Sequence, residues 1–154
     1  MNNILLVEDE PDILNIFSEQ LTRWGYNPIV ADNGEKGIAK YQESPIDLVI
    51  TDIKMPSLDG TTLLKRIKEI DRDAVVIMVT GYPSIDSAVL CMKDGAFDYL
   101  VKPINIDELK IKIEKGLEKK QLLKTISLWK GVNWSLIVSI PIWLILGIIL
   151  AKIL

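Results

Sequence analysis

The chain has 154 residues, which is room for one domain of ordinary size and an additional segment. It contains no histidine and one cysteine, which excludes a Ser-His triad, a zinc site of the usual kind and an intrachain disulfide. The charge is uneven: residues 1–118 carry a net −8 and residues 119–154 carry +5. We expect the acidic part not to bind nucleic acid, because phosphate contacts require clustered Lys and Arg.

Five short apolar runs alternate with segments of helix length in the first 118 residues. Several of the runs are continuous Val, Ile and Leu, which favours the strands of a parallel sheet that is covered on both faces. The alternation predicts an α/β fold, a doubly wound five-stranded parallel sheet flanked by helices. The expected strands are residues 4–7, 28–31, 48–51, 75–79 and 99–101.

The segments between these runs carry apolar residues at three- and four-residue spacing, which is typical of helices that pack on a sheet. Asn105 is expected to cap the fifth helix, with Glu108 as its capping-box partner. Cys91 lies in an apolar stretch, and we expect it to be a small buried hydrophobic residue. The predicted packing faces are Ile13, Leu14, Phe17, Leu21 and Trp24; Leu63, Leu64, Ile67 and Ile70; and Ile106, Leu109, Ile113 and Leu117.

Polar side chains stand where the predicted strands end, and in a parallel sheet these ends share one edge. Each has an ordinary explanation by itself, such as a turn or an acidic start of a helix. Together, three carboxylates without His or thiolate ligands indicate a hard cation, Mg²⁺. The set predicts a pocket for a tetrahedral dianion built on Asp52, an aspartyl phosphate. Its members are Glu8, Asp9, Asp52, Thr80 and Lys102.

Four motifs surround these positions, in this order along the chain: Leu5-Leu6-Val7-Glu8-Asp9-Glu10, Thr51-Asp52-Ile53-Lys54-Met55-Pro56 with Asp59-Gly60, Val79-Thr80-Gly81-Tyr82, and Gly95-Ala96-Phe97-Asp98-Tyr99-Leu100-Val101-Lys102-Pro103. Because of these motifs, residues 1 to about 120 resemble the receiver domain of two-component response regulators, a flavodoxin-like fold. The last two motifs are especially similar to receivers of enhancer-binding regulators. The resemblance implies a phosphoacceptor signalling domain, and not an enzyme with a substrate of its own.

The resemblance also implies a role for each matching position at the metal site. Asp52 would be the phosphoacceptor. Glu8 and Asp9 would hold Mg²⁺ together with Asp52 and the backbone carbonyl of Lys54. Glu8 stands where the family more often has Asp, a substitution that the family accepts.

Three further positions match the family's switch and its phosphoryl contact. Thr80 and Tyr99 would be the switch residues, with Tyr99 turning inward when Thr80 bonds the phosphoryl group. Lys102 would pair with a phosphoryl oxygen, and its bond to Pro103 would be cis. Because the chain has no histidine, the phosphoryl donor would be a sensor histidine kinase, a histidine phosphotransfer protein or a small phosphodonor.

The C-terminal segment has the composition of a membrane span. Residues 134–151 contain no charge, and residues 132–154 approach the roughly 20 residues that cross about 30 Å of hydrocarbon. Residues 119–131 would be a basic juxtamembrane linker or an extension of the fifth helix. The positive-inside rule predicts a single-pass protein of the cell membrane with residues 1–118 on the cytoplasmic side. The lysines before the span, which would also favour an anionic lipid bilayer, are Lys119, Lys120, Lys124 and Lys130.

We therefore expect a membrane-anchored single-domain response regulator. It would signal through phosphorylation-dependent contacts with an unknown downstream protein at the membrane, because the basic segment leads directly into the span. The alternatives are a receiver-like interaction module that is never phosphorylated and a membrane-localised phosphate sink. A haloacid-dehalogenase-type phosphatase would need a second Asp where Lys54 stands. Gly147 and Ala151 are a weak indication of a homodimer through the span.

Overall fold

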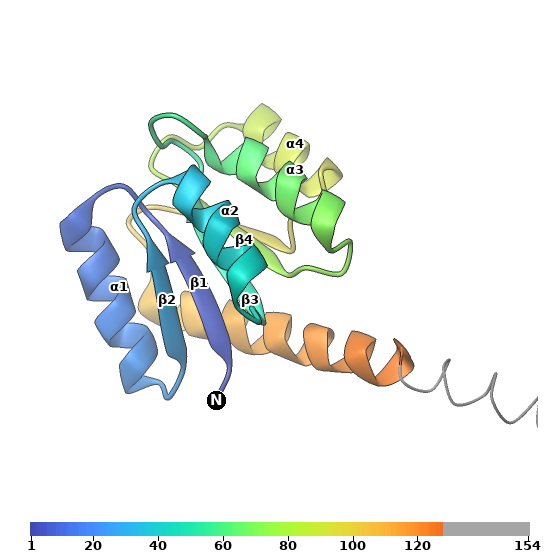
Figure 1. The fold of residues 1–154 in the computed structure, drawn as a ribbon. Helices are drawn as coiled ribbons and strands as arrows, with labels where there is room; N and C mark the ends of the chain where they lie inside the picture. Colours follow the sequence, from blue (N-terminus) through green and yellow to red (C-terminus); the bar gives the residue numbers. More distant parts are fainter. Residues whose placement is uncertain (128–154) are drawn as a thin grey trace, which may run out of the picture. The chain divides into compact units, whose positions relative to one another are not determined.

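Five parallel strands form the centre of the protein in a computed structural model that describes residues 1–127 (Figure 1). Their order in the sheet is β2-β1-β3-β4-β5, which confirms the predicted doubly wound fold. Strand pairing aligns Val7 with Thr51, Asp52 with Val79, and Thr80 with Val101, so the carboxyl ends lie at one edge. The strands are β1 (Asn3–Val7), β2 (Asn27–Ala31), β3 (Leu48–Asp52), β4 (Val76–Thr80) and β5 (Asp98–Val101).

Helices cover both faces of the sheet (Figure 1). One face packs against α1 and the helix that starts at residue 106, through Leu21, Leu109 and Ile113. The other packs against α3 and α4, through residues such as Leu64 and Cys91, with Ile38 of α2 alongside. The helices are α1 (Pro11–Arg23), α2 (Gly34–Glu43), α3 (Gly60–Ile70), α4 (Ile85–Lys93) and a C-terminal helix in which residues 106–127 are helical.

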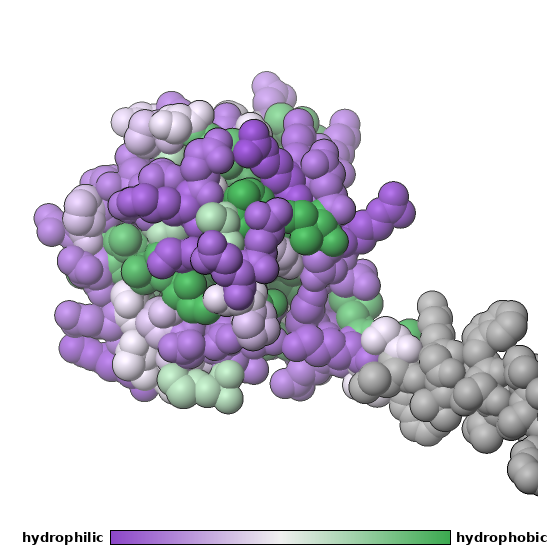
Figure 2. Space-filling view, in the orientation of Figure 1, coloured by the Kyte–Doolittle hydropathy of each residue, from purple (hydrophilic) through white to green (hydrophobic). Residues whose placement is uncertain are grey.

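Alternate residues of each strand enter opposite halves of the core, as the two-residue period of a strand requires. In β1, Leu5 and Val7 belong to one apolar cluster, whereas Ile4 and Leu6 belong to the other. Cys91 is fully buried, which confirms that it packs as a small hydrophobic residue. Most of the face shown in Figure 2 is hydrophilic, with hydrophobic side chains in scattered patches.

The helix ends agree with the sequence in part. The side chain of Asn105 accepts hydrogen bonds from the backbone N–H groups of Asp107 and Glu108, which confirms it as an N-cap. The predictions that Ile70 and Ile106 pack against the core were wrong, because these side chains are 50% and 38% exposed. Ile70 is the last residue of α3 and Ile106 the first of the C-terminal helix, and the end of a helix has fewer neighbours than its middle.

The compact unit that carries the sheet is Met1–Lys120. Among residues 1–127, no helix is long and apolar enough to cross a bilayer. The predicted span of residues 132–154, with Lys130, Gly147 and Ala151, lies outside the described residues.

Candidate functional site

The predicted site residues meet at the carboxyl edge of the sheet. Glu8 follows β1, Asp52 and Thr80 end β3 and β4, and Lys102 follows β5. Backbone hydrogen bonds fix these positions: Glu8 N donates to the Ala31 carbonyl at 3.1 Å, and Lys102 N donates to the Thr80 carbonyl at 2.8 Å. Residues up to 94 positions apart in the chain are thereby placed in contact.

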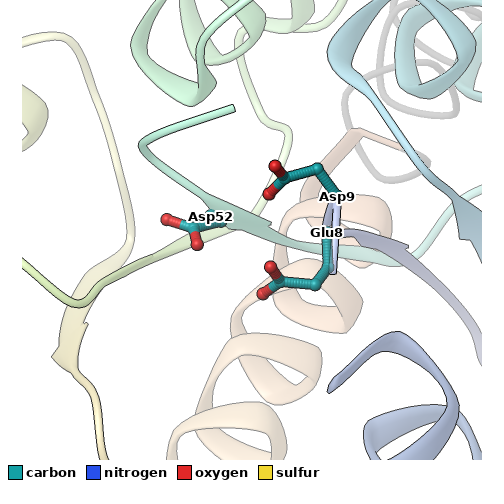
Figure 3. Close-up of side chains that lie close together, drawn as sticks. All are labelled: Glu8, Asp9 and Asp52. Carbon is teal, nitrogen blue, oxygen red and sulfur yellow. The ribbon is translucent and has the colours of Figure 1, made fainter. Parts of the chain in front are cut away.

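Three carboxylates form the acidic part of the site (Figure 3). One oxygen from each of Glu8, Asp9 and Asp52 lies within 4.8 Å of the others. Glu8 and Asp52 are buried, and Asp9 is half-buried. An all-oxygen donor set of this size fits a hard divalent cation such as Mg²⁺.

Lys102 compensates two of these charges. Its Nζ donates to Asp52 Oδ2 at 2.6 Å and to Glu8 Oε2 at 2.9 Å. Burial lowers the pKa of Lys102, but the hydrogen bonds and charges of Asp52 and Glu8 outweigh it and hold that pKa above the usual value. Burial, together with the charge of Asp52, raises the pKa of Glu8 above its usual value despite the hydrogen bond and charge of Lys102. The site is therefore a desolvated cluster of opposite charges.

The loop after β3 holds the second oxygen of Asp52. The backbone N–H of Lys54 donates to Asp52 Oδ1 at 3.1 Å. Gly60 N donates to the Ile53 carbonyl at 2.9 Å, which closes the loop and starts α3 against the strand end. A Cβ at position 60 would overlap the carbonyl oxygen of Asp52, so the close approach of α3 requires glycine.

The two expected switch residues lie on neighbouring strands. Thr80 is buried, and its Oγ1 accepts a hydrogen bond from the backbone N–H of Tyr82 at 3.1 Å. The Tyr99 hydroxyl is 2.9 Å from Ser87 Oγ on α4. Since the Ser87 hydroxyl donates to the Ser84 carbonyl at 3.0 Å, the Tyr99 hydroxyl is the donor in that pair.

The structure brings Glu10, Gly81 and Tyr82 to the site, three residues for which the sequence predicted no role there. A cavity at the site is lined by Asp9, Glu10, Asp52, Lys54, Gly81, Tyr82 and Lys102. The ammonium of Lys54 lies 3.9 Å from the centroid of the Tyr82 ring, a cation–π contact. The signals in the sequence that could have indicated Tyr82 are its position two residues after the end of β4 and its place in the Val79-Thr80-Gly81-Tyr82 motif.

The peptide bond between Lys102 and Pro103 is cis, as the family resemblance implied. The backbone of Lys54 contacts the site through its N–H group, which donates to Asp52. The role of its carbonyl as a metal ligand stays a prediction.

Comparisons with known proteins give the same family. The model of the "Response regulator receiver domain" matches residues 4–114. A transcriptional regulatory protein, ZraR of Klebsiella oxytoca, is 38% identical over 78% of this chain and 27% of its own length. The chain thus spans about a quarter of that relative.

Solved receiver structures superpose on the fold. A response regulator receiver domain protein from Clostridium thermocellum has a TM-score of 0.77 and 38% identity, over 80% of this chain and 99% of its own. The beryllofluoride-activated NtrC4 receiver domain dimer has a TM-score of 0.74 and 33% identity, over 78% and 99%. From the family match, the sheet order and the acidic edge, we conclude that the chain belongs to the receiver domains of two-component response regulators, signalling modules that accept a phosphoryl group on an aspartate from a histidine kinase partner and are not catalytic enzymes.

Proposed function

We propose that Asp52 is the residue that accepts the phosphoryl group. The observation that carries this proposal is the contact of Asp52 Oδ2 with the Lys102 ammonium at 2.6 Å, beside the carboxylates of Glu8 and Asp9. Asp52 is at the centre of the set and lines the cavity at the sheet edge, so a donor can approach it. Its loop hydrogen bond from Lys54 keeps the carboxylate at the strand end.

In the reaction, an oxygen of Asp52 attacks the phosphorus of a phosphohistidine. A P–O bond to Asp52 forms, the P–N bond breaks, and the imidazole leaves. Lys102 neutralises negative charge on the transferring group from its position against Asp52. Residues 1–154 contain no histidine, so the phosphohistidine donor lies outside them, in a sensor histidine kinase or a histidine phosphotransfer protein.

The carboxylates of Glu8, Asp9 and Asp52 fit Mg²⁺, with the Lys54 carbonyl as a further ligand. When bound, the ion would neutralise charge on the phosphoryl oxygens. Glu8 and Asp9 come from the turn after β1, whereas Asp52 ends β3, so the neighbouring strands hold the ligands in place.

The phosphoryl group would be sensed by Thr80. Thr80 Oγ1 accepts a hydrogen bond from Tyr82 N, and its O–H can at the same time donate to a phosphoryl oxygen on Asp52. Movement of Thr80 toward the phosphoryl group would draw the turn between β4 and α4 with it through Tyr82 N, and Tyr99 would follow because its hydroxyl is bonded to α4 through Ser87. A new partner for Thr80 thus shifts an existing equilibrium.

The exposed surface of α4 would bind a partner when this change occurs. We propose that the partner is a second copy of the chain, and the dimer formed by the beryllofluoride-activated NtrC4 receiver domain supports this choice. Light scattering with and without beryllofluoride tests this, with Leu90→Glu as the interface variant. A monomer under both conditions would oppose the dimer. The exposed apolar side chains of α4 are Ile85, Val89, Leu90 and Met92.

We further place this receiver on the cytoplasmic face of the cell membrane. The support is the sequence of residues 132–154, which has the length and composition of a span, and the lysines that precede it. Signalling would then reach an unknown partner at the membrane. Full-length protein that remains in the soluble fraction without detergent would refute the anchor.

The direct test of phosphorylation uses a radiolabelled acyl phosphate with Mg²⁺. Wild type is expected to take up label, and Asp52→Asn to take up none. Asp107→Asn, an exposed carboxylate outside the site, is the matched control and should label like wild type. Absence of label in the folded wild type would favour the inert interaction module. If Asp52 takes up label, does not return it to a donor protein, and the oligomeric state stays the same, the result would favour the phosphate sink.

A further inference from the structure

Asp71 joins three parts of the fold at the end of α3 that is remote from Asp52. Its Oδ2 accepts hydrogen bonds from the Tyr41 hydroxyl at 3.2 Å and from Lys120 Nζ at 2.7 Å. Its Oδ1 accepts from the backbone N–H of Asp73 at 2.9 Å. One carboxylate therefore connects α2, the turn between α3 and β4, and the C-terminal helix.

The contact is partly shielded from water, since the side chain of Asp71 is 34% exposed and that of Lys120 is much less exposed. The side chain of Lys120 is 11% exposed, which is lower than the 18% of Lys102 at the acidic edge of the sheet. Lys120 also donates to the carbonyl of Asp73 at 3.3 Å. Burial raises the pKa of Asp71, but the hydrogen bonds from Lys120, Asp73 and Tyr41 outweigh it and hold that pKa below its usual value. Removal of one partner would leave a partly desolvated charge without compensation.

The contact lies where the chain leaves the receiver. Lys120 is the last residue of the compact unit Met1–Lys120. Lys120 was expected to belong to the basic group that faces lipid, but it is held by the domain instead. At the other end of α3, Gly60 is in tight contact with the Asp52 carbonyl. Helix α3 therefore extends from the end of β3, where the proposed phosphoacceptor Asp52 lies, to its C-cap residue Asp71.

We propose that Asp71, Tyr41 and Lys120 form an exit clamp that holds the last turns of the receiver's C-terminal helix, and that α3 transmits the state of Asp52 to this clamp. The second part rests on the proposed function. Phosphorylation displaces the loop at residues 53–59, moves α3 against the turn that carries Asp71, and loosens Lys120. Packed helices transmit such shifts as rigid bodies.

Amide hydrogen exchange of the full-length chain in detergent micelles tests the clamp. Lys120→Met and Asp71→Asn are expected to accelerate exchange of residues 114–120 by about tenfold, the factor that corresponds to about 1.4 kcal/mol. The matched control is Lys115→Met, which removes an exposed lysine from the same helix and should leave exchange within about twofold of wild type. Exchange in Lys120→Met that equals wild type would overturn the clamp. Should both variants fail to fold, Tyr41→Phe removes one hydrogen bond alone and must still accelerate exchange.

A second experiment tests whether phosphorylation of Asp52 changes the clamp through α3. Treatment with an acyl phosphate and Mg²⁺ should accelerate exchange of residues 114–120 in wild type and leave Asp52→Asn unchanged. If Asp52 takes up label while exchange stays constant, transmission through α3 is refuted and the proposed function stands. If Asp52 takes up no label, the proposed function fails, and the clamp is judged by the first experiment alone.

Discussion

Lys102 Nζ lies 2.6 Å from Asp52 Oδ2 and at the same time 2.9 Å from Glu8 Oε2, so one ammonium compensates two buried carboxylates. Lys102→Met should therefore lower the free energy of unfolding by about 3 kcal/mol at pH 7, because like charges are left close together without water. Urea denaturation measures this. Added Mg²⁺ should restore part of the loss, since the cation replaces the missing charge.

The matched control for Lys102 is Lys36→Met. Lys36 pairs with Asp32 at 2.7 Å, but both side chains are more than half exposed, so its loss should leave the urea midpoint close to that of wild type. Equal urea midpoints for wild type and Lys102→Met would show that Lys102 does not stabilise the acidic cluster.

Mg²⁺ affinity should depend on the carboxylates that converge on Asp52. Glu8→Gln and Asp9→Asn should each weaken Mg²⁺ binding by roughly 10- to 100-fold in calorimetric titrations, because each removes a charged oxygen ligand. Glu10→Gln serves as the control, since Glu10 lines the same cavity but is not among the three converging carboxylates. A loss of affinity in Glu10→Gln as large as that in Asp9→Asn would contradict the assignment.

The start of α3 against Asp52 should tolerate no side chain. Gly60→Ala should reduce the free energy of unfolding by about 2 to 3 kcal/mol, because the added Cβ overlaps the backbone of Asp52 and Ile53. Gly81→Ala is the comparison, since a Cβ there meets only Lys102 Cδ at 3.9 Å. Thermal unfolding of both variants decides the matter, and similar melting temperatures would show that α3 can move away from the strand at little cost.

Acid should weaken the Asp71 contact. The pKa of Asp71 is lowered in the folded chain, so its contribution to stability is present above the unfolded pKa of about 3.9 and is lost as the pH falls through the folded pKa. The difference in unfolding free energy between wild type and Asp71→Asn should therefore be larger at pH 7 than at pH 3. Denaturant titrations at both pH values test this, and a difference that is independent of pH would argue against the ion pair with Lys120.

Thr80 should separate phosphorylation from its readout. Thr80→Ala should accept label on Asp52 but should not form the dimer, because no hydroxyl remains to donate to a phosphoryl oxygen and link it to Tyr82 N. Thr80→Ser keeps the hydroxyl and should behave as wild type. Dimerisation of phosphorylated Thr80→Ala in light scattering would remove Thr80 from the switch.

The five strands and the residues at their ends could be predicted because strand periodicity and turn chemistry are local properties of the sequence. The sequence also predicted the N-cap at Asn105, for the same reason. It was wrong at Ile70 and Ile106, since their apolar spacing continues to the helix ends while the packing does not. Burial depends on the neighbouring element, and spacing within one helix cannot show where that neighbour stops.

Which side chains share a partner depends on how the elements pack in three dimensions. The sequence placed Lys102 at the acidic edge, but its contact with both Glu8 and Asp52 joins residues 94 and 50 positions away. The contact between Lys120 and Asp71 joins residues 49 positions apart and removes from the basic segment a lysine that the sequence assigned to it. Strand register and helix packing set these distances, and no local pattern encodes them.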